Sequence, residues 1–308
     1  MKKDFSLFKS SNLVAVLLVL LGAICFSSKA VMVKLAYRYE VDSASLLALR
    51  MLFALPFYLV IAYWSNRKMP QTYKISQKDI AYMVLFGVLG FYVASLCDFI
   101  GLQYITASLE RLVLFIYPTL VIILSAVFLK QKIEIRQYGA LFLTYLGIGI
   151  AFIDKNNFDS ENQILLGAFW VFLAALAYAI HLIGSGHLLP KIGTMRYTSI
   201  VMISACVAVI LHNAVVNQLA LFDFETEVYV LGIMMAVIAT VFPSFLIMHG
   251  IKVIGASNAA IIGSVGPIST VALAYVFLDE RLGWLQWFGT GLVIAGVLMI
   301  SLQKKGKK

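Results

Sequence analysis

GLQYITAS at residues 101–108 and GIKVIGAS at residues 250–257 are two versions of one stretch, and they lie 149 residues apart. The match continues without a gap at the same offset through the spans that follow. Chance matches between apolar residues are common, so the aligned proline, glycine and polar positions carry most of the weight. Those positions include Pro118 with Pro267, Gln137 with Gln286, and Gly147 with Gly296. The chain therefore contains an internal duplication, which predicts a fold built from two related halves.

The composition places this chain in a membrane. Of its 308 residues, 62% are hydrophobic and only 13% are charged, and the mean hydropathy is +0.93. A soluble domain is about half apolar and roughly a quarter charged. There is too little polar surface to solvate a globule of this size, so lipid is the natural solvent. An internal duplication in such an apolar chain is typical of secondary transporters.

Apolar runs recur whose length, about 20 residues, is what a helix needs to cross a hydrocarbon core of about 30 Å. We predict ten spans, at residues 12–36, 43–64, 78–101, 106–129, 135–153, 164–188, 195–218, 227–250, 256–278 and 284–302. They lack the alternating pattern of a barrel strand, so an all-α integral membrane protein is expected. The first span carries Lys29 and no clear cleavage site, which indicates a retained helix rather than a signal peptide.

The net charge of +9 is distributed in a way that indicates orientation rather than nucleic-acid binding. With the N-terminus in the cytoplasm and ten crossings, the cytoplasmic segments hold 17 Lys and Arg residues. The outer segments hold four, namely Lys34, Arg38, Lys155 and Arg281. This positive-inside bias predicts an inner-membrane protein with both termini in the cytoplasm. The basic tails are then anchors near anionic lipid.

Each copy of the repeat is predicted to hold five spans, the first at residues 12–153 and the second at residues 164–302. Five is an odd number, so the second copy must insert in the opposite sense to the first. Equivalent loops carry opposite charge, as this inversion requires. Residues 130–132 read KQK and are predicted inside, whereas residues 279–281 read DER and are predicted outside. The polar stretch DKNNFDSEN at residues 154–162 suits an outer loop between the two copies.

These features resemble the drug/metabolite transporter superfamily, and within it the EamA-type permeases that export amino acids and other metabolites. The resemblance rests on residues 105–153 and 254–302 and on ALRMLFALP at residues 48–56. The second half matches better, with its Ala-Ser pair, mid-helix proline and FLDERL turn, from which the KQK turn of the first half departs. The resemblance covers nearly the whole chain and is specific for fold rather than substrate. It implies a central cavity lined mostly by spans 1, 3, 4, 6, 8 and 9, with alternating access by rocking of the two halves.

Charged residues inside the predicted spans are the sharpest local signal, because a charge at mid-bilayer costs about 2.5–3.5 kcal/mol. Five stand out in the outer half of the first repeat: Lys29, Arg50, Asp98, Glu110 and Arg111. At the offset of 149, the last three fall on Ile247, Ala259 and Ala260. A charge needed only to hold the common fold would be expected in both halves.

We therefore interpret Lys29 as part of the substrate site, where its ammonium attracts a carboxylate or another anionic group. Asp98 is its expected partner in the empty state. The alternative is a buried ion-pair network that fixes the packing of the first four spans. Arg50 is expected to be structural, because the second span is peripheral in the family that the chain resembles. Glu110 is expected to complement the helix dipole in the first turn of its span.

Other candidates for substrate contact come from the spans that line the cavity in the family that the chain resembles. The aromatic candidates are Tyr92, Tyr117, Tyr178 and Phe242, and the polar ones are Asn258 and Ser264. His181 and His249 lie near the predicted cytoplasmic ends of their spans. An imidazole there can relay protons in a coupled transporter, and interfacial packing is the alternative.

Pro118 and Pro267 occupy equivalent positions in the two copies. Each is expected to remove a backbone hydrogen bond in mid-helix and to bend its span. A paired bend beside a central cavity predicts a hinge, with a static kink as the alternative.

The expected function is a small-molecule exporter. A polytopic enzyme acting on lipid or an isoprenoid would need clustered acids or histidines, and no paired-carboxylate, His-Glu-x-x-His or nucleophile-elbow motif occurs. A channel would need polar rings repeated by oligomer symmetry. No P-loop sequence occurs, so energy is expected from the substrate gradient or from ions. No catalytic residue, cofactor, metal site or nucleic-acid partner is expected; the partners are a small-molecule substrate and membrane lipid. Substrate identity, transport direction, ion coupling and oligomeric state stay open.

Overall fold

The computed structural model describes residues 3–68, 75–130, 135–153, 161–247 and 265–301. Every regular element in these ranges is helical. The first half contains α1 (Lys3–Ala36), η1 (Tyr37–Tyr39), α2 (Ser43–Lys68), α3 (Gln77–Gly87), η2 (Val88–Val93), α4 (Ala94–Tyr104), α5 (Ala107–Leu114), α6 (Tyr117–Leu129) and α7 (Ile135–Ile153). The second half contains α8 (Glu161–Ile192), α9 (Thr194–Val216), α10 (Thr226–Ala236), η4 (Val237–Val241), α13 (Gly266–Leu278) and α14 (Trp284–Ser301).

Within the described residues, seven helical stretches are long and apolar enough to cross a membrane. They are Leu13–Tyr39, Ser43–Arg67, Gln77–Tyr104, Ala107–Phe128, Gln163–Ser185, Thr194–Val216 and Thr226–Ile247. The helices α7, α13 and α14 fall on three further predicted spans, although residues 256–264 of one span lie outside the described part. The chain is thus a multi-pass helical membrane protein, as its composition predicts. Ten crossings remain a prediction.

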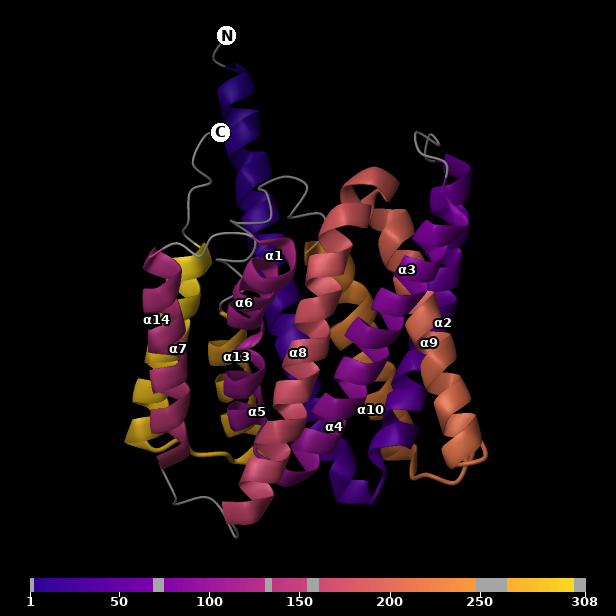
Figure 1. The fold of residues 1–308 in the computed structure, drawn as a ribbon. Helices are drawn as coiled ribbons and strands as arrows, with labels where there is room; N and C mark the ends of the chain where they lie inside the picture. The colour runs from indigo at the N-terminus through magenta and orange to yellow at the C-terminus, as the bar shows by residue number, and fades with distance from the viewer. Residues whose placement is uncertain (1–2, 69–74, 131–134, 154–160, 248–264, 302–308) are drawn as a thin grey trace.

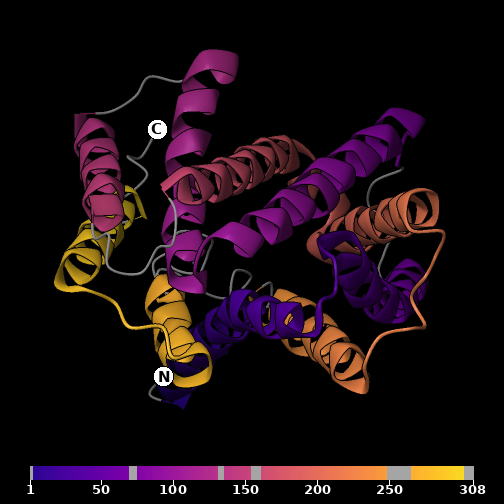
Figure 2. The ribbon, with the colours of Figure 1, turned by 90° about the horizontal axis from the view of Figure 1, so that it is seen from below.

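The long helices run side by side in one bundle, with their connections at its two ends (Figure 1). The start of α1 and the end of α14 lie at the same end of this bundle. The most extensive contacts pair α7 with α14, α2 with α9, α4 with α8, and α1 with α13. Each pair joins a helix of the first half to a helix of the second, so the halves interleave. The pair of α7 and α14 stands at one side of the bundle when it is viewed along its length (Figure 2).

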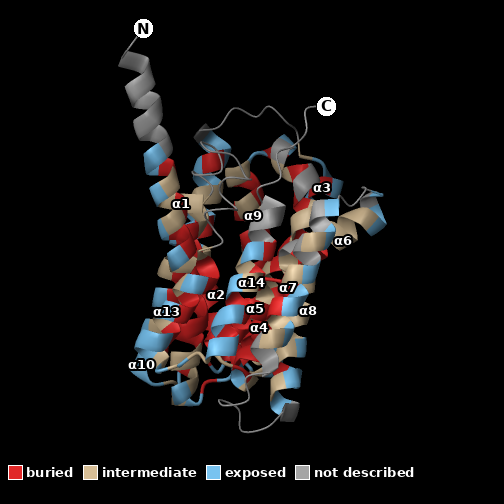
Figure 3. Ribbon diagram, turned by 90° about the vertical axis from the view of Figure 1, so that its left-hand side faces the viewer, coloured by how far each residue is buried: buried red, intermediate tan, exposed pale blue. Residues whose placement is uncertain are grey.

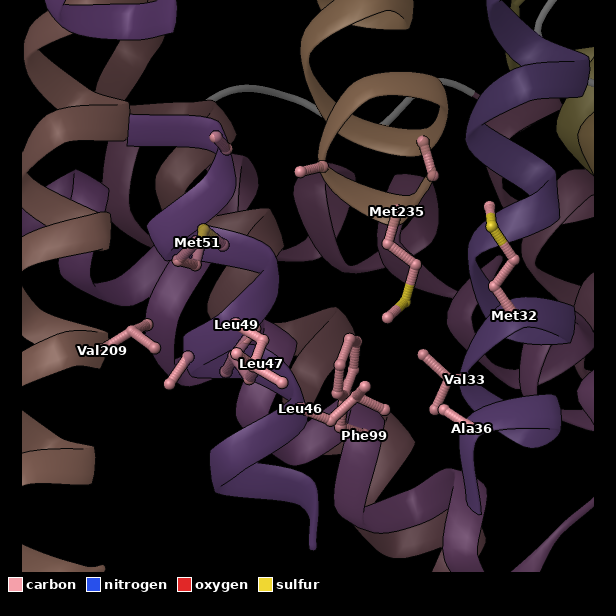
Figure 4. Close-up of a cluster of buried hydrophobic side chains, with 14 of the residues drawn as sticks. Met32, Val33, Ala36, Leu46, Leu47, Leu49, Met51, Phe99, Val209 and Met235 are labelled. Carbon is pink, nitrogen blue, oxygen red and sulfur yellow. The ribbon is translucent and has the colours of Figure 1, made fainter. Parts of the chain in front are cut away.

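Burial is densest toward the end of the bundle opposite the start of α1 (Figure 3). The main apolar core lies there between α1, α2, α4, α9 and α10 (Figure 4). Its buried members include Met32, Val33, Ala36, Leu46, Leu47, Leu49, Met51, Phe99, Val209 and Met235. On the outer faces the pattern reverses, and large apolar side chains such as Val215 and Phe142 are 82% and 68% exposed. A soluble protein avoids apolar surface on this scale, whereas lipid solvates it.

The 149-residue offset is visible in the backbone of the described residues. α6 and α13 each contain 13 residues and each carries its proline in the first turn. Each is followed by a residue in the left-handed region, Lys130 at φ 53° and Asp279 at φ 56°. The π-helical segments η2 and η4 begin at Val88 and Val237, which are again 149 residues apart. The second copy of the repeated octapeptide, residues 250–257, lies outside the described part of the chain.

The predicted span 106–129 contains one apolar helical stretch, Ala107–Phe128, that is interrupted by a turn. The structure divides it into α5, which ends at Leu114, and α6, which begins at Tyr117, with a turn at Phe115 and Ile116. Pro118 therefore lies in the first turn of a new helix rather than in mid-helix, where it was expected to break a hydrogen bond. A proline costs little in the first turn because its missing N–H would have no partner within the helix there. The break is thus a change of helix, and it places two helix ends inside the bundle.

Candidate functional site

The centre of the candidate site is an ion pair between the first and third predicted spans. Lys29 lies on α1 and Asp98 on α4, and Lys29 Nζ is 2.5 Å from Asp98 Oδ2. Their side chains are only 7% and 2% exposed. Two charges withdrawn from solvent this far must be paired, because removing either partner leaves an uncompensated buried charge. The structure therefore brings together the two residues that the sequence links, and their role in binding substrate stays a proposal.

Glu110 and Arg111 lie next to this pair on α5, and both are buried. Arg111 Nε donates to Thr270 Oγ1 on α13 at 3.0 Å, and its Nη2 donates to the Phe26 carbonyl on α1 at 3.2 Å. The guanidinium therefore ties α5 to one helix from each half. Glu110 is 0% exposed, and no described residue donates a hydrogen bond to either of its carboxylate oxygens. The sequence suggested that Glu110 complements the helix dipole, but its side chain makes no bond to the first amides of α5.

Those first amides are capped by two other residues. Thr106 Oγ1 accepts from Leu109 N at 3.2 Å. Glu280, which follows α13, accepts from Ala107 N at 2.9 Å, from Ser108 N at 3.1 Å and from Ser108 Oγ at 2.7 Å. A carboxylate at a helix N-terminus meets unpaired N–H groups and the positive end of the helix dipole. Glu280 thereby fastens the second half of the chain onto the first at the end of the bundle where α5 begins.

A cavity of about 300 Å³ lies beside this fastening. Its lining residues are Lys34, Tyr37, Arg38, Leu278 and Glu280, so both halves contribute to its wall. Lys34 Nζ donates to the Leu102 carbonyl at 3.0 Å, and this bond holds the ammonium at the rim. By the predicted topology this is the outer end of the protein, and Glu280 both lines the cavity and caps the start of α5.

Arg50 connects α2 to the π-helical segment η4. Its Nε donates to Thr240 Oγ1 at 2.9 Å, and its guanidinium lies 5.7 Å from the centre of the Phe99 ring. The residue is 2% exposed. These contacts suit the structural role expected for Arg50, because they join α2 to η4, although its Nη1 has no hydrogen-bond partner among the described residues.

Three of the predicted aromatic and histidine residues do come together. The rings of Tyr117 and Tyr178 are 5.1 Å apart, and those of Tyr178 and His181 are 5.9 Å apart. Arg111 interacts electrostatically with both tyrosines, which links this aromatic group to the charged group. Phe91 and Phe115 complete it, at 5.0 Å from His181 and 5.8 Å from Tyr117. The cluster of Phe91, Phe115, Tyr117, Tyr178 and His181 is called the aromatic cluster below.

His181 is held on both sides of its ring. Its Nδ1 is 2.9 Å from the Phe86 carbonyl, and its Nε2 is 3.4 Å from Ser185 Oγ. Gly90, in η2, lies against the ring so closely that a Cβ there would be 2.3 Å from His181 Cγ. This confinement suits packing better than proton relay, since neither ring nitrogen is left without a partner.

The remaining sequence candidates lie elsewhere. Tyr92 packs against His212, with ring centres 5.5 Å apart, and so faces away from its neighbour Phe91. Phe242, just after η4, is 46% exposed. Asn258, Ser264 and His249 lie outside the described residues. The sequence selected Tyr92, and in the structure its neighbour Phe91 lies against His181 instead; both residues belong to the π-helical segment η2.

No group of three or more His, Cys, Asp or Glu side chains that would hold a metal ion occurs among the described residues. The site is therefore built from an ion pair, an unpaired acid, a tethered arginine and a set of aromatic rings. Such a set can bind a small solute that has an anionic group and an apolar body.

Comparisons with known proteins agree with this membrane architecture. The sequence profile of the EamA-like transporter family matches residues 13–153 and again residues 165–302. The uncharacterized transporter YcbK of Bacillus subtilis is 32% identical over 297 residues, covering 94% of this chain and 94% of the relative. The uncharacterized inner membrane transporter YicL of Salmonella typhimurium is 22% identical over 295 residues, covering 93% and 95%. One crystal structure superposes on 95% of this chain and 98% of its own with a TM-score of 0.65 at 11% identity, which shows the fold alone.

Proposed function

Since this chain belongs to the EamA-like transporter family, we propose that it exports a small metabolite, such as an amino acid, across the inner membrane by alternating access. The observation that carries this proposal is the buried pair of Lys29 and Asp98. A lysine buried inside a membrane bundle normally faces a substrate or ion pathway and not the lipid. Its neighbour Arg111 reaches Thr270 in the second half of the chain.

Several observations support two inverted five-helix repeats as the scaffold. The matched bounds of α6 and α13, their left-handed caps and the matched π-helical segments relate the halves by one offset. The contacts repeat as a two-fold axis requires, because α1 packs against α13 as α8 packs against α6. Both ends of the helical chain lie at one end of the bundle, which requires an even number of crossings (Figure 1). Ten crossings meet this condition and seven do not.

Alternating access in this scaffold is a rocking of one half against the other. The broken span formed by α5 and α6 supports it, since irregular backbone inside a membrane is found where it lines a pathway. Pro118 and Pro267 then act as the paired hinges, each in the first turn of its helix, α6 or α13. The bonds between Glu280 and the first turn of α5 hold the predicted outer end shut in this conformation.

The substrate class follows from what surrounds the ion pair. In the empty state the Asp98 carboxylate binds the Lys29 ammonium, and a substrate carboxylate would compete with Asp98 for that ammonium. The rings of Tyr117 and Tyr178 offer an apolar wall close by. An amino acid meets both requirements, with its carboxylate on Lys29 and its side chain against the aromatic cluster.

The test is transport by the purified protein in liposomes, with a panel of labelled amino acids and other small metabolites, with and without a pH gradient. We expect vectorial movement of at least one anionic or zwitterionic compound, and its loss in Lys29→Gln. Lys34→Gln is the matched control, because its ammonium lies on the same helix but bonds a carbonyl oxygen. Normal uptake by Lys29→Gln with unchanged substrate affinity would remove Lys29 from the site.

A further inference from the structure

The most isolated acid in the described structure is Glu110. It is 0% exposed, and neither carboxylate oxygen has a donor among the described residues. Asp98, itself 2% exposed, has one oxygen on Lys29 and its other oxygen, Oδ1, without a donor. The carboxyl groups of Asp98 and Glu110 are direct electrostatic neighbours. Two acids from different helices, α4 and α5, therefore meet where no described residue donates a hydrogen bond to three of their four oxygens.

Two ionised carboxylates in this position would repel each other and leave three oxygens without partners. An ionised carboxylate buried without a donor is among the costliest arrangements in a protein interior. A proton on one of the acids removes the repulsion and leaves one oxygen instead of three without a partner, because an O–H from one carboxyl group then donates to the other. Paired carboxyl groups that share one proton are a known solution to this arrangement.

The neighbouring charges leave Glu110 as the acid that takes the proton. Lys29 on α1 is bound to Asp98, and Arg111 on α5 is turned away to Thr270 and the Phe26 carbonyl. Among the described residues, no other titratable or charged group near the two acids or Arg111 donates a hydrogen bond to Glu110. These groups are Arg50 on α2, Tyr37 in η1, Cys97 on α4, Tyr117 on α6 and Tyr178 on α8. Asp98 keeps its negative charge against Lys29, and Glu110 has no such partner.

We propose that Glu110 and Asp98 hold one proton between them and form the proton-binding site of this transporter, with Glu110 donating to Asp98. The proton lies on the two acids, whereas the substrate is proposed to bind Lys29, the partner of Asp98. Any anion that draws Lys29 away removes the counter-charge of Asp98 and so changes how firmly the pair holds its proton. Proton and substrate binding are thereby coupled through one ammonium, and the coupling is reciprocal. Only this coupling rests on the proposed function; the shared proton does not.

Infrared spectroscopy of the purified protein in lipid nanodiscs tests the shared proton without any substrate. We expect a carbonyl-stretch band of a protonated carboxylic acid at neutral pH, shifted in D₂O, and lost in Glu110→Gln. Gln keeps the size of the side chain and can donate its amide to Asp98, so this variant is expected to fold. Glu227→Gln is the control, since Glu227 is an exposed acid and its loss should leave the band unchanged. Asp98→Asn should shift the band, because the acceptor of the proton changes.

A wild-type spectrum without the band, or a band that persists unchanged in Glu110→Gln, would overturn the proposal. The coupling has its own readout in liposomes, where a pH gradient should drive accumulation of a transported amino acid by wild type and Glu227→Gln but not by Glu110→Gln. A band that behaves as expected together with transport that ignores the gradient would overturn the coupling alone. If no compound of the panel moves, the proposed function fails while the infrared result still decides whether the proton is there.

Discussion

At the scale of single residues, the site depends on how few charges the bundle buries and how they are satisfied. Lys29 and Asp98 satisfy each other, Arg111 is tied to two helices, and Glu110 is left without a donor among the described residues. The sequence was sufficient to select all four, because charges inside apolar spans are rare and costly. It also paired Lys29 with Asp98, but it was not sufficient to assign the partners of Arg111, because one of them, Thr270, lies 159 residues away.

Lys29→Gln should destabilise the protein by about 3–5 kcal/mol, because Asp98 would lose its counter-charge while staying buried. Lys29→Gln with Asp98→Asn should recover most of this loss, since no unpaired charge remains. Thermal unfolding in detergent measures both effects, with Lys34→Gln as the control. If the double variant regains both stability and transport, the pair is structural only; we expect it to regain stability alone.

At the scale of elements, the two π-helical segments η2 and η4 are features that the sequence did not predict. They widen the helix in two equivalent places, and η2 sets the aromatic cluster by presenting Phe91 rather than Tyr92 to His181. One extra residue in a helical turn leaves no signature in an apolar sequence, so this exchange could not be predicted. The turn at Phe115 and Ile116 was equally hidden, because Pro118 predicts a bend and a helix start alike.

Gly90→Ala should disturb the aromatic cluster, because its Cβ would lie 2.3 Å from His181 Cγ. Overpacking of this kind costs about 1–3 kcal/mol and should displace the His181 ring. Gly149→Ala is the matched control, since nothing lies within 4 Å of a Cβ there and alanine favours the helix. The two variants should differ in unfolding temperature and in transport rate. Equal values would mean that η2 accommodates the added methyl group at no energetic cost.

Glu280→Ala should release the first turn of α5 and open the cavity at that end of the bundle. The lost bonds involve a charged acceptor, which contributes about 1.5–3 kcal/mol per hydrogen bond. A single cysteine at Leu278, which lines the cavity, reports this opening by its rate of reaction with a maleimide. We expect at least a roughly tenfold faster reaction, since tenfold corresponds to about 1.4 kcal/mol. Asp279→Asn, whose side chain is 84% exposed, should leave the rate unchanged.

At the scale of the whole molecule, the chain is a membrane transporter of the EamA-like family and not an enzyme. Composition and the repeated stretch were enough for this class and for the helical architecture, because both depend on properties summed over many residues. The interleaving of the halves could not be read from the spans, since contacts such as that of α7 with α14 depend on local fit. At Gly147, for example, a Cβ would lie 2.5 Å from the Gly289 carbonyl oxygen, so the two helices approach almost backbone to backbone.

The predicted topology places residue 222 outside and residue 135 inside. Single cysteines at Phe222 and Ile135 test this in whole cells, on a background from which Cys25, Cys97 and Cys206 have been removed. Both positions are more than 80% exposed, so burial does not limit the reaction. A membrane-impermeant maleimide should label Phe222→Cys alone, and Ile135→Cys only after the cells are permeabilised. Labelling of both in intact cells would place them on the same face and contradict the inverted arrangement.

The buried group of Lys29, Asp98, Glu110 and Arg111 comes entirely from one half of the chain and lies near the start of α5. In the predicted topology it therefore lies in the outer half of the membrane, off the midpoint of the electric field. An ion that reaches it from the distant end crosses most of the voltage, at about 2.3 kcal/mol per charge for each 100 mV, while one from the near end crosses little. The resting potential of the cell thus favours loading from one face, although the scaffold around the group is nearly symmetric.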